Sequence, residues 1–514
     1  KMESVQIKLT LAVAMIFQFV LILYAGSSFA AKLPNVVYIL TDDQDVDLLG
    51  QYPMPKTKQL IADEGITFTN MFVTSPLCCP SRSSILTSQY IHNNLVTNNS
   101  MSGNCSSLAW QKNSEMNAFP TYLQANGYST FFAGKYLNEY GNKDLGGVKH
   151  VPPGWDDWNA LVGNSVYYNY TLSVNGIEER HGNTYEQDYL TDVIHRKAIN
   201  FLSKKANSSS PFFMMISTPA CHAPFTPAPQ YEKNFPNDQA PRTKHFNIHG
   251  KDKHWLVMQA ITPMPDDTIA AIDNFFRNRL RTLLSVDDMI EDVVTTLKNI
   301  GELDNTYIFF SSDNGYHLGQ FSLPDDKRQL YDFDIRVPLF VRGPGIKANS
   351  SSEESVMAID LAPTFLELAR LSVPSHFDGL SLKPILTNQQ HPYRDSVLVE
   401  YHGEHLNVVT GCPRYSDQGM ANCNAHCVCE DSWNNTYACI RTHTTSASYK
   451  YCAMQDNDNF VEAYDLKNDP FELVNIAKSA SPDLLTKLSQ QLAELSLCAG
   501  ANCHSNPSVV VVRK

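Results

Sequence analysis

Continuous apolar runs without alternation stand out along this chain. Four such runs lie at residues 35–40, 130–133, 212–216 and 307–310. Strands that are buried on both faces of a parallel sheet have this pattern, whereas half-exposed strands alternate apolar and polar residues. Each run therefore predicts one strand of a central parallel sheet.

Helical periodicity appears between these runs. Residues 56–64 form one such segment, and Gly65 follows it as a suitable helix C-cap. Residues 282–300 place apolar side chains three and four positions apart and end at Gly301. Strands that alternate with helices predict an α/β fold with a large, mostly parallel sheet covered by helices.

The pattern changes near residue 390. Cysteines gather there, and residues 449–451 and 461–464 predict short antiparallel strands before a last helix at 482–497. A chain of 514 residues also exceeds the usual size of one hydrophobic core. We expect a larger α/β domain over 31–390 and a smaller, cysteine-rich α+β domain with an antiparallel sheet over 391–514.

The N-terminal segment has the pattern of a signal peptide. An apolar run from Leu9 to Tyr24 follows Lys8, and small residues continue to Ala30. We predict a signal peptide over 1–30, cleaved near Ala30, with a retained signal anchor as the alternative. Because no later segment is long and apolar enough to span a bilayer, we expect no stable membrane insertion. The expected destination is the secretory pathway, with the lysosome or the extracellular space as its end point.

Composition and charge narrow the classes of function. Hydrophobic residues make up 43% of the chain and charged residues 18%, which is typical of globular proteins. The formal net charge is -13, and no block of Lys or Arg stands out, which argues against nucleic acid as a partner. An acidic protein can still bind an anionic substrate through a local cluster of cations and metal.

Cysteines and glycosylation motifs agree with secretion. Nine of the 12 cysteines follow residue 220, and in an oxidising compartment they predict disulfides. A zinc site built from Cys423, His426, Cys427 and Cys429 is the alternative, but its spacing matches neither a finger nor a ribbon. Six sequons predict a glycoprotein: Asn98, Asn104, Asn169, Asn207, Asn349 and Asn434.

Polar side chains follow the predicted strands. They are Asp42 and Asp43, Lys135, His222, and Asp313 with Asn314. In an open α/β sheet, ligands bind at the carboxyl ends of the strands. Carboxylate and amide oxygens are the ligands that calcium and magnesium prefer. A pair of aspartates after a strand is also common in an ordinary loop or helix cap. At this point the sequence is therefore consistent with a metal site and with a purely structural loop.

A cysteine-containing motif at 77–88 adds a second kind of chemistry. Cys78-x-Pro80-Ser81-Arg82 is followed by Leu86-Thr87-Ser88, and Pro80 is well placed near a helix start. Cys78 would then face free backbone N–H groups at the positive end of the helix dipole, which favours an anion. Arg82 adds a cation one turn later. A buried or disulfide-bonded cysteine beside an ordinary helix would show the same local pattern.

These motifs together resemble those of the sulfatase family. Cys78-x-Pro-Ser-Arg82 with Leu86-Thr-Ser88 is similar to the signature that a formylglycine-generating enzyme reads when it oxidises the first cysteine. Thr41-Asp-Asp43 and Ser312-Asp-Asn-Gly315 resemble the two metal-binding motifs of that family. Gly134-Lys135 and Lys327, nine residues before Arg336-Val-Pro338, resemble its two lysine motifs.

The resemblance implies a sulfuric ester hydrolase with an alkaline-phosphatase-like fold. It implies one Ca²⁺ per chain and 3-oxoalanine, or formylglycine, formed from Cys78. By position it assigns Asp42, Asp43, Cys78, Asp313 and Asn314 to the metal, and Cys78, Arg82, Lys135 and Lys327 to catalysis. His222, which follows the apolar run at 212–216, is the further catalytic candidate. His222 or Lys327 would protonate the leaving oxygen.

Further segments resemble lysosomal members of the family that remove the 6-O-sulfate of N-acetylglucosamine in heparan or keratan sulfate. These segments are Phe132–Tyr140, Lys253–Trp255, Leu283–Asp288, Ser312–Ser322 and Cys427–Asp431. A sulfated glycosaminoglycan or oligosaccharide is the substrate that this implies. Three alternatives remain: an aryl or other carbohydrate sulfatase, a phosphoester or phosphonate hydrolase of the same superfamily, and a non-catalytic glycan-binding glycoprotein.

One position departs from the family pattern. Many sulfatases carry a histidine two residues after the first lysine, where this chain has Leu137. The base usually assigned to that histidine is therefore in doubt. His317 is the candidate that could supply an imidazole near the substrate, and a purely structural histidine is the alternative.

Overall fold

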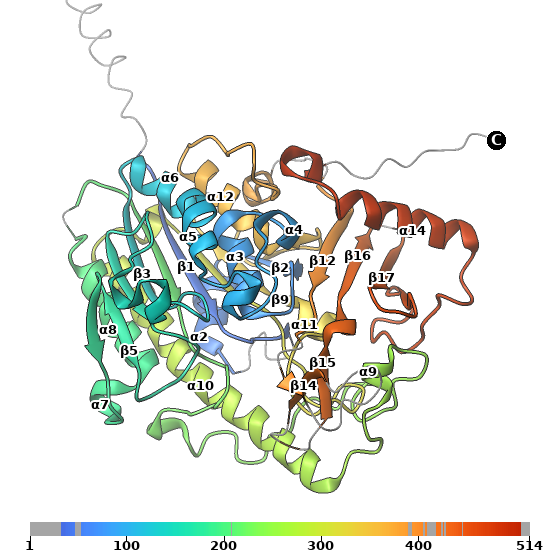
Figure 1. The fold of residues 1–514 in the computed structure, drawn as a ribbon. Helices are drawn as coiled ribbons and strands as arrows, with labels where there is room; N and C mark the ends of the chain where they lie inside the picture. The colour runs from blue at the N-terminus through green and yellow to red at the C-terminus, as the bar shows by residue number, and fades with distance from the viewer. Residues whose placement is uncertain are drawn as a thin grey trace, which may run out of the picture.

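A mixed sheet of 11 strands runs through the larger part of the molecule (Figure 1). Its order is β10 (Ser350–Ser352), β2 (Ile66–Phe72), β9 (Arg336–Arg342), β8 (Thr306–Ser312), β1 (Asn35–Thr41), β7 (Phe212–Ser217), β3 (Ser129–Lys135), β4 (Asp157–Leu161), β5 (Thr171–Val174) and β6 (Ile177–Arg180), and β11 (Val356–Met357) pairs with β2. The central strands β8, β1, β7, β3 and β4 are parallel. The four predicted strands are β1, β3, β7 and β8, so the predicted, mostly parallel sheet is confirmed.

The computed structural model describes residues 32–46, 53–206, 208–388, 393–404, 407–408, 418–422, 425, 428–444 and 446–504. The predicted signal peptide, the sequon Asn207 and the predicted domain boundary at residue 391 lie outside these residues. Among the described residues, no helix is both long and apolar enough to cross a membrane.

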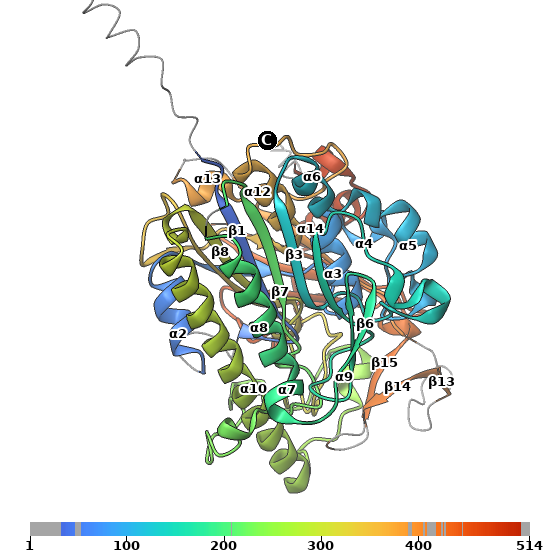
Figure 2. The same ribbon diagram turned by 90° about the vertical axis from the view of Figure 1, so that its left-hand side faces the viewer.

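Helices cover both faces of the sheet. In Figure 2, α8 (Leu190–Ser203) and α10 (Asp266–Asn299) lie across one face, and α3 (Cys78–Thr87), α6 (Phe119–Ala125) and α12 (Leu361–Leu368) belong to the other. The side chains of β1 divide between the two sides. Val37 and Ile39 join the core under α8 and α10, whereas Val36, Tyr38 and Leu40 join the core on the other side. Burial on both faces explains why the run at 35–40 is apolar without alternation.

Two of the three predicted helices differ from the observed ones. Residues 56–64 form a short helix α2 (Pro55–Thr57) and a π-helical turn (Lys58–Ala62). α10 begins at Asp266, sixteen residues before the predicted start at 282, because Ile272, Phe276 and Leu280 extend the same apolar stripe toward the N-terminus. The shorter α-helices are α4 (Ile91–Asn94), α5 (Leu108–Asn113), α7 (Tyr185–Asp188), α9 (Trp255–Met258), α11 (Asp332–Ile335) and α13 (Lys383–Leu386).

A separate antiparallel sheet forms the C-terminal part. Its strands are β12 (Ser396–Tyr401), β16 (Tyr437–His443), β17 (Ser448–Met454) and β18 (Val461–Asp465), and α14 (Pro482–Leu495) packs beside them. A three-stranded sheet joins β13 (Asn407–Val408), β14 (Gln418–Asn422) and β15 (Val428–Ser432). The predicted strands at 449–451 and 461–464 are confirmed, and so is a smaller α+β part with an antiparallel sheet.

The hydrophobic core does not stop at the change of architecture. Leu398 of β12 and Tyr437 of β16 belong to the same buried cluster as Tyr38 of β1 and Phe365 of α12. The two parts of the chain therefore share one core. The division into domains at residue 391 stays a prediction.

Three disulfides lie within the described residues: Cys79–Cys105, Cys439–Cys452 and Cys498–Cys503. Cys429 also takes part in a disulfide, which removes one of the four candidate zinc ligands. Cys423, His426 and Cys427 lie outside the described residues. Among the described cysteines, Cys78 and Cys221 keep free thiols.

Candidate active site

The carboxyl ends of the central strands bring the predicted site residues together. In the parallel register Thr41 of β1 lies opposite Ser312 of β8, and Gly134 of β3 lies opposite Ser217 of β7. The residues that follow these strand ends therefore meet at one edge of the sheet, as the rule for open α/β sheets predicts. Gly134 is required there, because a Cβ atom at this position would lie 1.7 Å from the Ser217 carbonyl oxygen.

Three carboxylates and one carboxamide form an oxygen-rich cluster. Oxygens of Asp42, Asp43 and Asp313 all lie within 4.8 Å of one another, and the three side chains are buried. Asn314 donates from Nδ2 to Asp43 Oδ1 at 2.8 Å, but its buried Oδ1 has no hydrogen-bond partner among the described residues. A buried acceptor without a donor is costly, and a cation would satisfy it. The residues therefore fit the calcium ion that the motifs imply.

A second group of possible ligands overlaps the first. Asp42, Cys78 and His222 also place ligand atoms within 4.8 Å of one another. This set mixes sulfur, nitrogen and oxygen, which suits softer metals such as zinc. The carboxylate cluster has the additional unpaired oxygen of Asn314, so we take the hard-oxygen set as the candidate metal site.

Three cations face the three carboxylates. Lys135 Nζ lies 2.8 Å from Asp42 Oδ2, Lys327 Nζ lies 2.6 Å from Asp43 Oδ1, and Arg82 Nε lies 2.7 Å from Asp313 Oδ2. The formal charges cancel, so a bound divalent cation would leave the site net positive. A net positive, largely buried site favours a tetrahedral oxyanion.

Burial and the neighbouring cations act on these carboxylates in opposite directions. Burial would raise the pKa of Asp42, but Lys135, His222 and Arg82 hold it well below its usual range. At Asp313 burial prevails over the Arg82 guanidinium and raises the pKa to about 6. Asp42 is therefore charged throughout the physiological range, whereas Asp313 is partly protonated near neutral pH unless a cation binds beside it.

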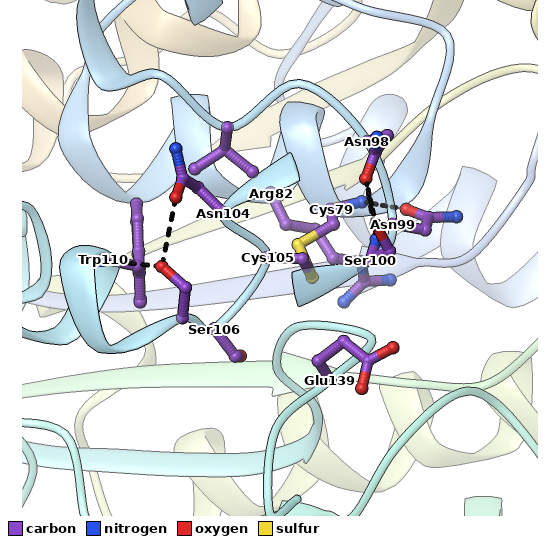
Figure 3. The surroundings of a disulfide bond; sticks show 12 residues. Cys79, Arg82, Asn98, Asn99, Ser100, Asn104, Cys105, Ser106, Trp110 and Glu139 are labelled. Atoms are coloured by element: carbon purple, nitrogen blue, oxygen red, sulfur yellow. Dashed lines mark hydrogen bonds between the residues drawn. A yellow bond between two sulfur atoms is a disulfide. The ribbon is translucent and has the colours of Figure 1, made fainter. Parts of the chain in front are cut away.

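Cys78 is the first residue of α3, and its side chain is fully buried. Its Sγ lies 3.8 Å from Asp42 Oδ1 and 4.0 Å from Asp43 Oδ1. Burial raises the pKa of the Cys78 thiol to about 11. The neighbouring Cys79 is bonded to Cys105 (Figure 3), so of the two adjacent cysteines only Cys78 is free.

His222 follows β7 and faces the same cluster. Its Nδ1 lies 2.7 Å from the Ala223 carbonyl oxygen, which can only accept, so this nitrogen carries a hydrogen. Nε2 is then the free nitrogen, and it lies 3.8 Å from Asp43 Oδ2. Burial lowers the pKa of His222, although Asp42 and Asp43 oppose the shift. The lowered pKa favours the neutral ring, and the imidazolium formed when Nε2 gains a proton would release that proton readily.

A pocket of about 310 Å³ opens beside the cluster. Its walls contain Asp43, Asn99, Asn164, His222, Ala223, Tyr316, Asp326, Lys327, Arg328, Met420 and Ala421. Three predicted site residues, Asp43, His222 and Lys327, thus line a space that a substrate can enter. The other predicted site residues are buried beside this pocket, within the hydrogen-bond and ion-pair network described above. They are Asp42, Cys78, Arg82, Lys135, Asp313 and Asn314.

Several residues of the site were not predicted from the sequence. Ser165 Oγ donates to Asp42 Oδ2 at 2.5 Å, and Ser217 Oγ accepts from Arg82 Nη1 at 2.7 Å. Ser217 ends β7, so the rule that selected the other strand ends could have found it. Asp326 and Arg328 flank Lys327, and their ion pair at 2.5 Å forms part of the pocket wall. Asn99 and Ser165 lie in loops, and no sequence pattern indicates their place.

His317 does not line this pocket, so its role in binding substrate gains no support here and stays a prediction. Its fully buried ring lies between Asp334, 3.0 Å from Nδ1, and Glu430, 3.4 Å from Nε2. Burial opposes a charge on this ring, but the two carboxylates raise its pKa to about 10. His317 is therefore an imidazolium that joins α11 to β15. Leu137 is buried in the core, so it offers no substitute for the missing histidine.

We expect His317→Gln to lower the free energy of unfolding by about 3 to 5 kcal/mol, the usual cost of breaking a buried ion pair. Because the folded-state pKa is raised, the contribution of His317 is complete below the unfolded value of 6.5 and falls as the pH rises toward about 10. Urea unfolding of both proteins at pH 6 and pH 9 should show a smaller difference at pH 9. If the His317→Gln protein is as stable as the wild type but loses its catalytic activity, His317 acts on the substrate instead.

Comparisons with known proteins agree with this geometry. Residues 34–371 match the family model described as Sulfatase. The chain is 54% identical over 484 residues to the N-acetylglucosamine-6-sulfatase of Homo sapiens, covering 93% of this chain and 87% of that protein.

Solved structures extend the likeness to the fold. A sulfated-sugar enzyme solved in complex with its substrate D-glucosamine-2-N,6-O-disulfate has a TM-score of 0.72 at 28% identity, covering 90% of this chain and 97% of that one. The phosphonate monoester hydrolase of Agrobacterium radiobacter has a TM-score of 0.64 at 19% identity, covering 90% and 95%. These neighbours confirm the alkaline-phosphatase-like fold that the sequence motifs imply.

Proposed function

Because this chain belongs to the sulfatase family, we propose that it removes the 6-O-sulfate of N-acetylglucosamine residues in heparan or keratan sulfate. The family and the relatives that carry the name make the chain a sulfatase enzyme. The sulfated polymer, the formylglycine at residue 78 and the calcium ion are our proposal. The observation that carries it is the free, buried Cys78 at the start of α3, beside the carboxylate cluster.

The environment of Cys78 disfavours an unmodified thiol as the nucleophile. With a pKa raised to about 11, an unmodified Cys78 would be a protonated thiol at neutral or acidic pH. A protonated thiol is a weak nucleophile, so an unmodified cysteine suits this site poorly. When present, formylglycine supplies a hydrated aldehyde whose hydroxyl can attack sulfur, and calcium supplies a fixed double positive charge.

The side chains of the chain itself would hold the sulfate. Arg82, Lys135 and Lys327 surround residue 78 and would stabilise negative charge on the transferring group. Asp42, Asp43, Asp313 and Asn314 would hold the calcium ion through oxygen. Lys135 and Ser165 both bind Asp42 Oδ2, whereas Asp42 Oδ1 has only longer contacts, to Arg82 Nη2 at 3.6 Å and to Cys78 Sγ at 3.8 Å.

His222 is the better candidate for the proton donor to the leaving sugar oxygen. It lines the pocket, Ala223 fixes its orientation, and its Nε2 is free. Lys327 is the rival, but both oxygens of Asp43 bind its ammonium group. Although burial opposes it, the Asp43 carboxylate raises the pKa of Lys327, which makes this ammonium a poor acid.

We expect His222→Ala to slow hydrolysis of a sugar 6-sulfate by about 10²- to 10⁴-fold, the usual range for general acid catalysis. An aryl sulfate with an acidic phenol needs little help to leave, so its rate should fall far less. Steady-state rates on the two substrates measure this split, and Lys327→Ala serves as the comparison. Equal losses on both substrates would mean that His222 positions the sulfate instead.

The proposed identity of the sulfated sugar can be tested with defined compounds. The solved relative at 28% identity has D-glucosamine-2-N,6-O-disulfate as its substrate, which supports a 6-O-sulfated glucosamine derivative here. Sulfate release from a panel of sulfated mono- and disaccharides should be fastest with 6-sulfated N-acetylglucosamine at the non-reducing end. Faster release from another sulfated position would overturn the proposed substrate.

A phosphonate or phosphate ester hydrolase is the second candidate. Its support is the likeness to the phosphonate monoester hydrolase, which at 19% identity concerns the fold alone. Turnover of matched aryl sulfate and aryl phosphonate esters separates the two, and we expect the sulfate to be preferred.

We also propose that the protein reaches the lysosome through the secretory pathway, with secretion as the alternative. The disulfides support an oxidising compartment. Among the sequons, Asn169 and Asn349 are exposed, and Asn98 and Asn104 are partly exposed. Asn434 is only 1% exposed and its Nδ2 is enclosed, so a glycan on it would not fit this structure.

A further inference from the structure

Two asparagines in the pocket wall present their amide nitrogens without a partner. Asn99 Oδ1 accepts from the Cys79 backbone N–H at 2.9 Å, and Asn164 Oδ1 accepts from the Ser165 backbone N–H at 2.8 Å. Since a backbone N–H can only donate, the oxygen of each amide must face it, and the nitrogen faces away. Figure 3 shows this orientation for Asn99. Within the described part of the chain, neither Nδ2 has a hydrogen-bond acceptor.

We propose that Asn99 and Asn164 are specificity-determining residues whose Nδ2 groups donate hydrogen bonds to oxygen atoms of the substrate sugar. This inference rests on the proposed function, since it assigns the sugar contacts of the same site. The ligand class is an N-acylated hexosamine 6-sulfate, which offers hydroxyl, ring and carbonyl oxygens as acceptors. A neutral amide donor binds such oxygens without attracting a second sulfate in competition.

Both amides are hydrogen-bonded to the backbone of residues next to the proposed catalytic and metal-binding side chains. Cys79 follows Cys78 directly, and Ser165 donates to Asp42 Oδ2. Each amide is therefore held in place relative to the backbone that carries Cys78 or the Asp42 partner Ser165. This coupling fixes the distance between the sugar contacts and the sulfate site.

The loop that carries Asn99 is held at further points. The Cys79–Cys105 disulfide joins α3 to the end of this loop, and the Asn99 backbone N–H donates to Glu404 Oε1 at 3.3 Å. Glu404 in turn pairs with Arg328 at 3.0 Å, on the same pocket wall. Because this loop is already restrained, the Asn99 side chain and its loop lose less conformational entropy when the sugar binds.

The test compares Asn99→Ala and Asn164→Ala on 6-sulfated N-acetylglucosamine and on a small aryl sulfate. We expect each variant to lower kcat/KM for the sugar sulfate about 5- to 10-fold, which corresponds to one lost hydrogen bond. The aryl sulfate lacks the sugar oxygens, so its loss should be clearly smaller. Asn99→Asp and Asn164→Asp should lose more on the sugar, because they replace a donor by a negative charge.

Asn183→Ala is the matched control, since Asn183 is exposed and lies outside the pocket wall. Its rates on both substrates should equal those of the wild type. A second readout uses the inactive Cys78→Ser protein. Calorimetric titration with 6-sulfated N-acetylglucosamine should give a Kd that rises by a similar factor when Asn99 or Asn164 is also replaced.

The outcomes separate this inference from the proposed function. If the wild type releases no sulfate from 6-sulfated N-acetylglucosamine yet hydrolyses the aryl sulfate, the proposed function fails. If the wild type does release it and the alanine variants keep its kcat/KM, only the present inference is overturned. Equal losses on both substrates also overturn it, because the amides would then only support α3 and the Asp42 loop. Should Asn99→Ala not fold, Asn164→Ala still decides the question.

Discussion

Cys78→Ser is expected to give a folded protein whose sulfatase activity is at least ~10⁴-fold lower, the scale of loss for a missing covalent nucleophile. Serine is similar in size to cysteine but would not be converted to formylglycine by the proposed route. Stability should change little, because serine fits the space of a cysteine, and among the described residues the Cys78 thiol has just two hydrogen-bond contacts, both long, at 3.8 and 4.0 Å. Released sulfate and a thermal melt, measured on the same preparation, check both statements.

The control for this result is the neighbouring cysteine. Cys79→Ser removes the disulfide to Cys105 and should lower the melting temperature, while the aldehyde at residue 78 persists. Mass spectrometry of the active wild type should find an aldehyde at 78 and a disulfide-bonded cysteine at 79. A free thiol at residue 78 in fully active enzyme would contradict the proposed chemistry.

The second large effect concerns the metal site. We expect Asp42→Asn to lose calcium binding and to lower kcat/KM by roughly 10²- to 10³-fold or more, as when a preorganised charge contact is removed. Asp42 is buried and its carboxylate is shared by Lys135, Ser165 and the candidate ion site. Chelation of the wild type should abolish activity, and added calcium should restore activity and raise the melting temperature.

Asp45→Asn is the matched variant for this test. Asp45 is a buried carboxylate of the same loop, and it pairs with Arg279 at 2.7 Å rather than lying in the acidic cluster. Its calcium-dependent rise in melting temperature should remain, even if its overall stability falls. Active wild-type enzyme without bound metal would refute the metal assignment.

The fold could be predicted to the extent that burial leaves a local pattern. β1, β3, β7 and β8 are covered on both faces, so their apolar runs were visible without any structure. α10 was predicted too short, because its N-terminal half has fewer apolar positions and many Asn and Arg residues. The turn after α2 becomes π-helical, a local choice that side-chain periodicity does not reveal.

The site could be predicted where its residues follow strands or stand in motifs. Asp42, Asp313, Lys135 and Cys78 were found in this way, and the structure brings them together. His317 was assigned to the substrate because it follows the second metal motif closely. Its partners, Asp334 and Glu430, come from distant segments, so the ion pair that holds it could not be read from neighbouring residues.

The shared hydrophobic core couples the unfolding of the two parts of this protein. Side chains of β12 and β16 pack in the same cluster as those of β1 and α12. Neither part can therefore melt without exposing apolar surface of the other, and heat should disrupt both in a single cooperative step. A fragment cut near residue 390 would leave one side of its core open to water, and aggregation or proteolysis would be its fate rather than independent catalysis.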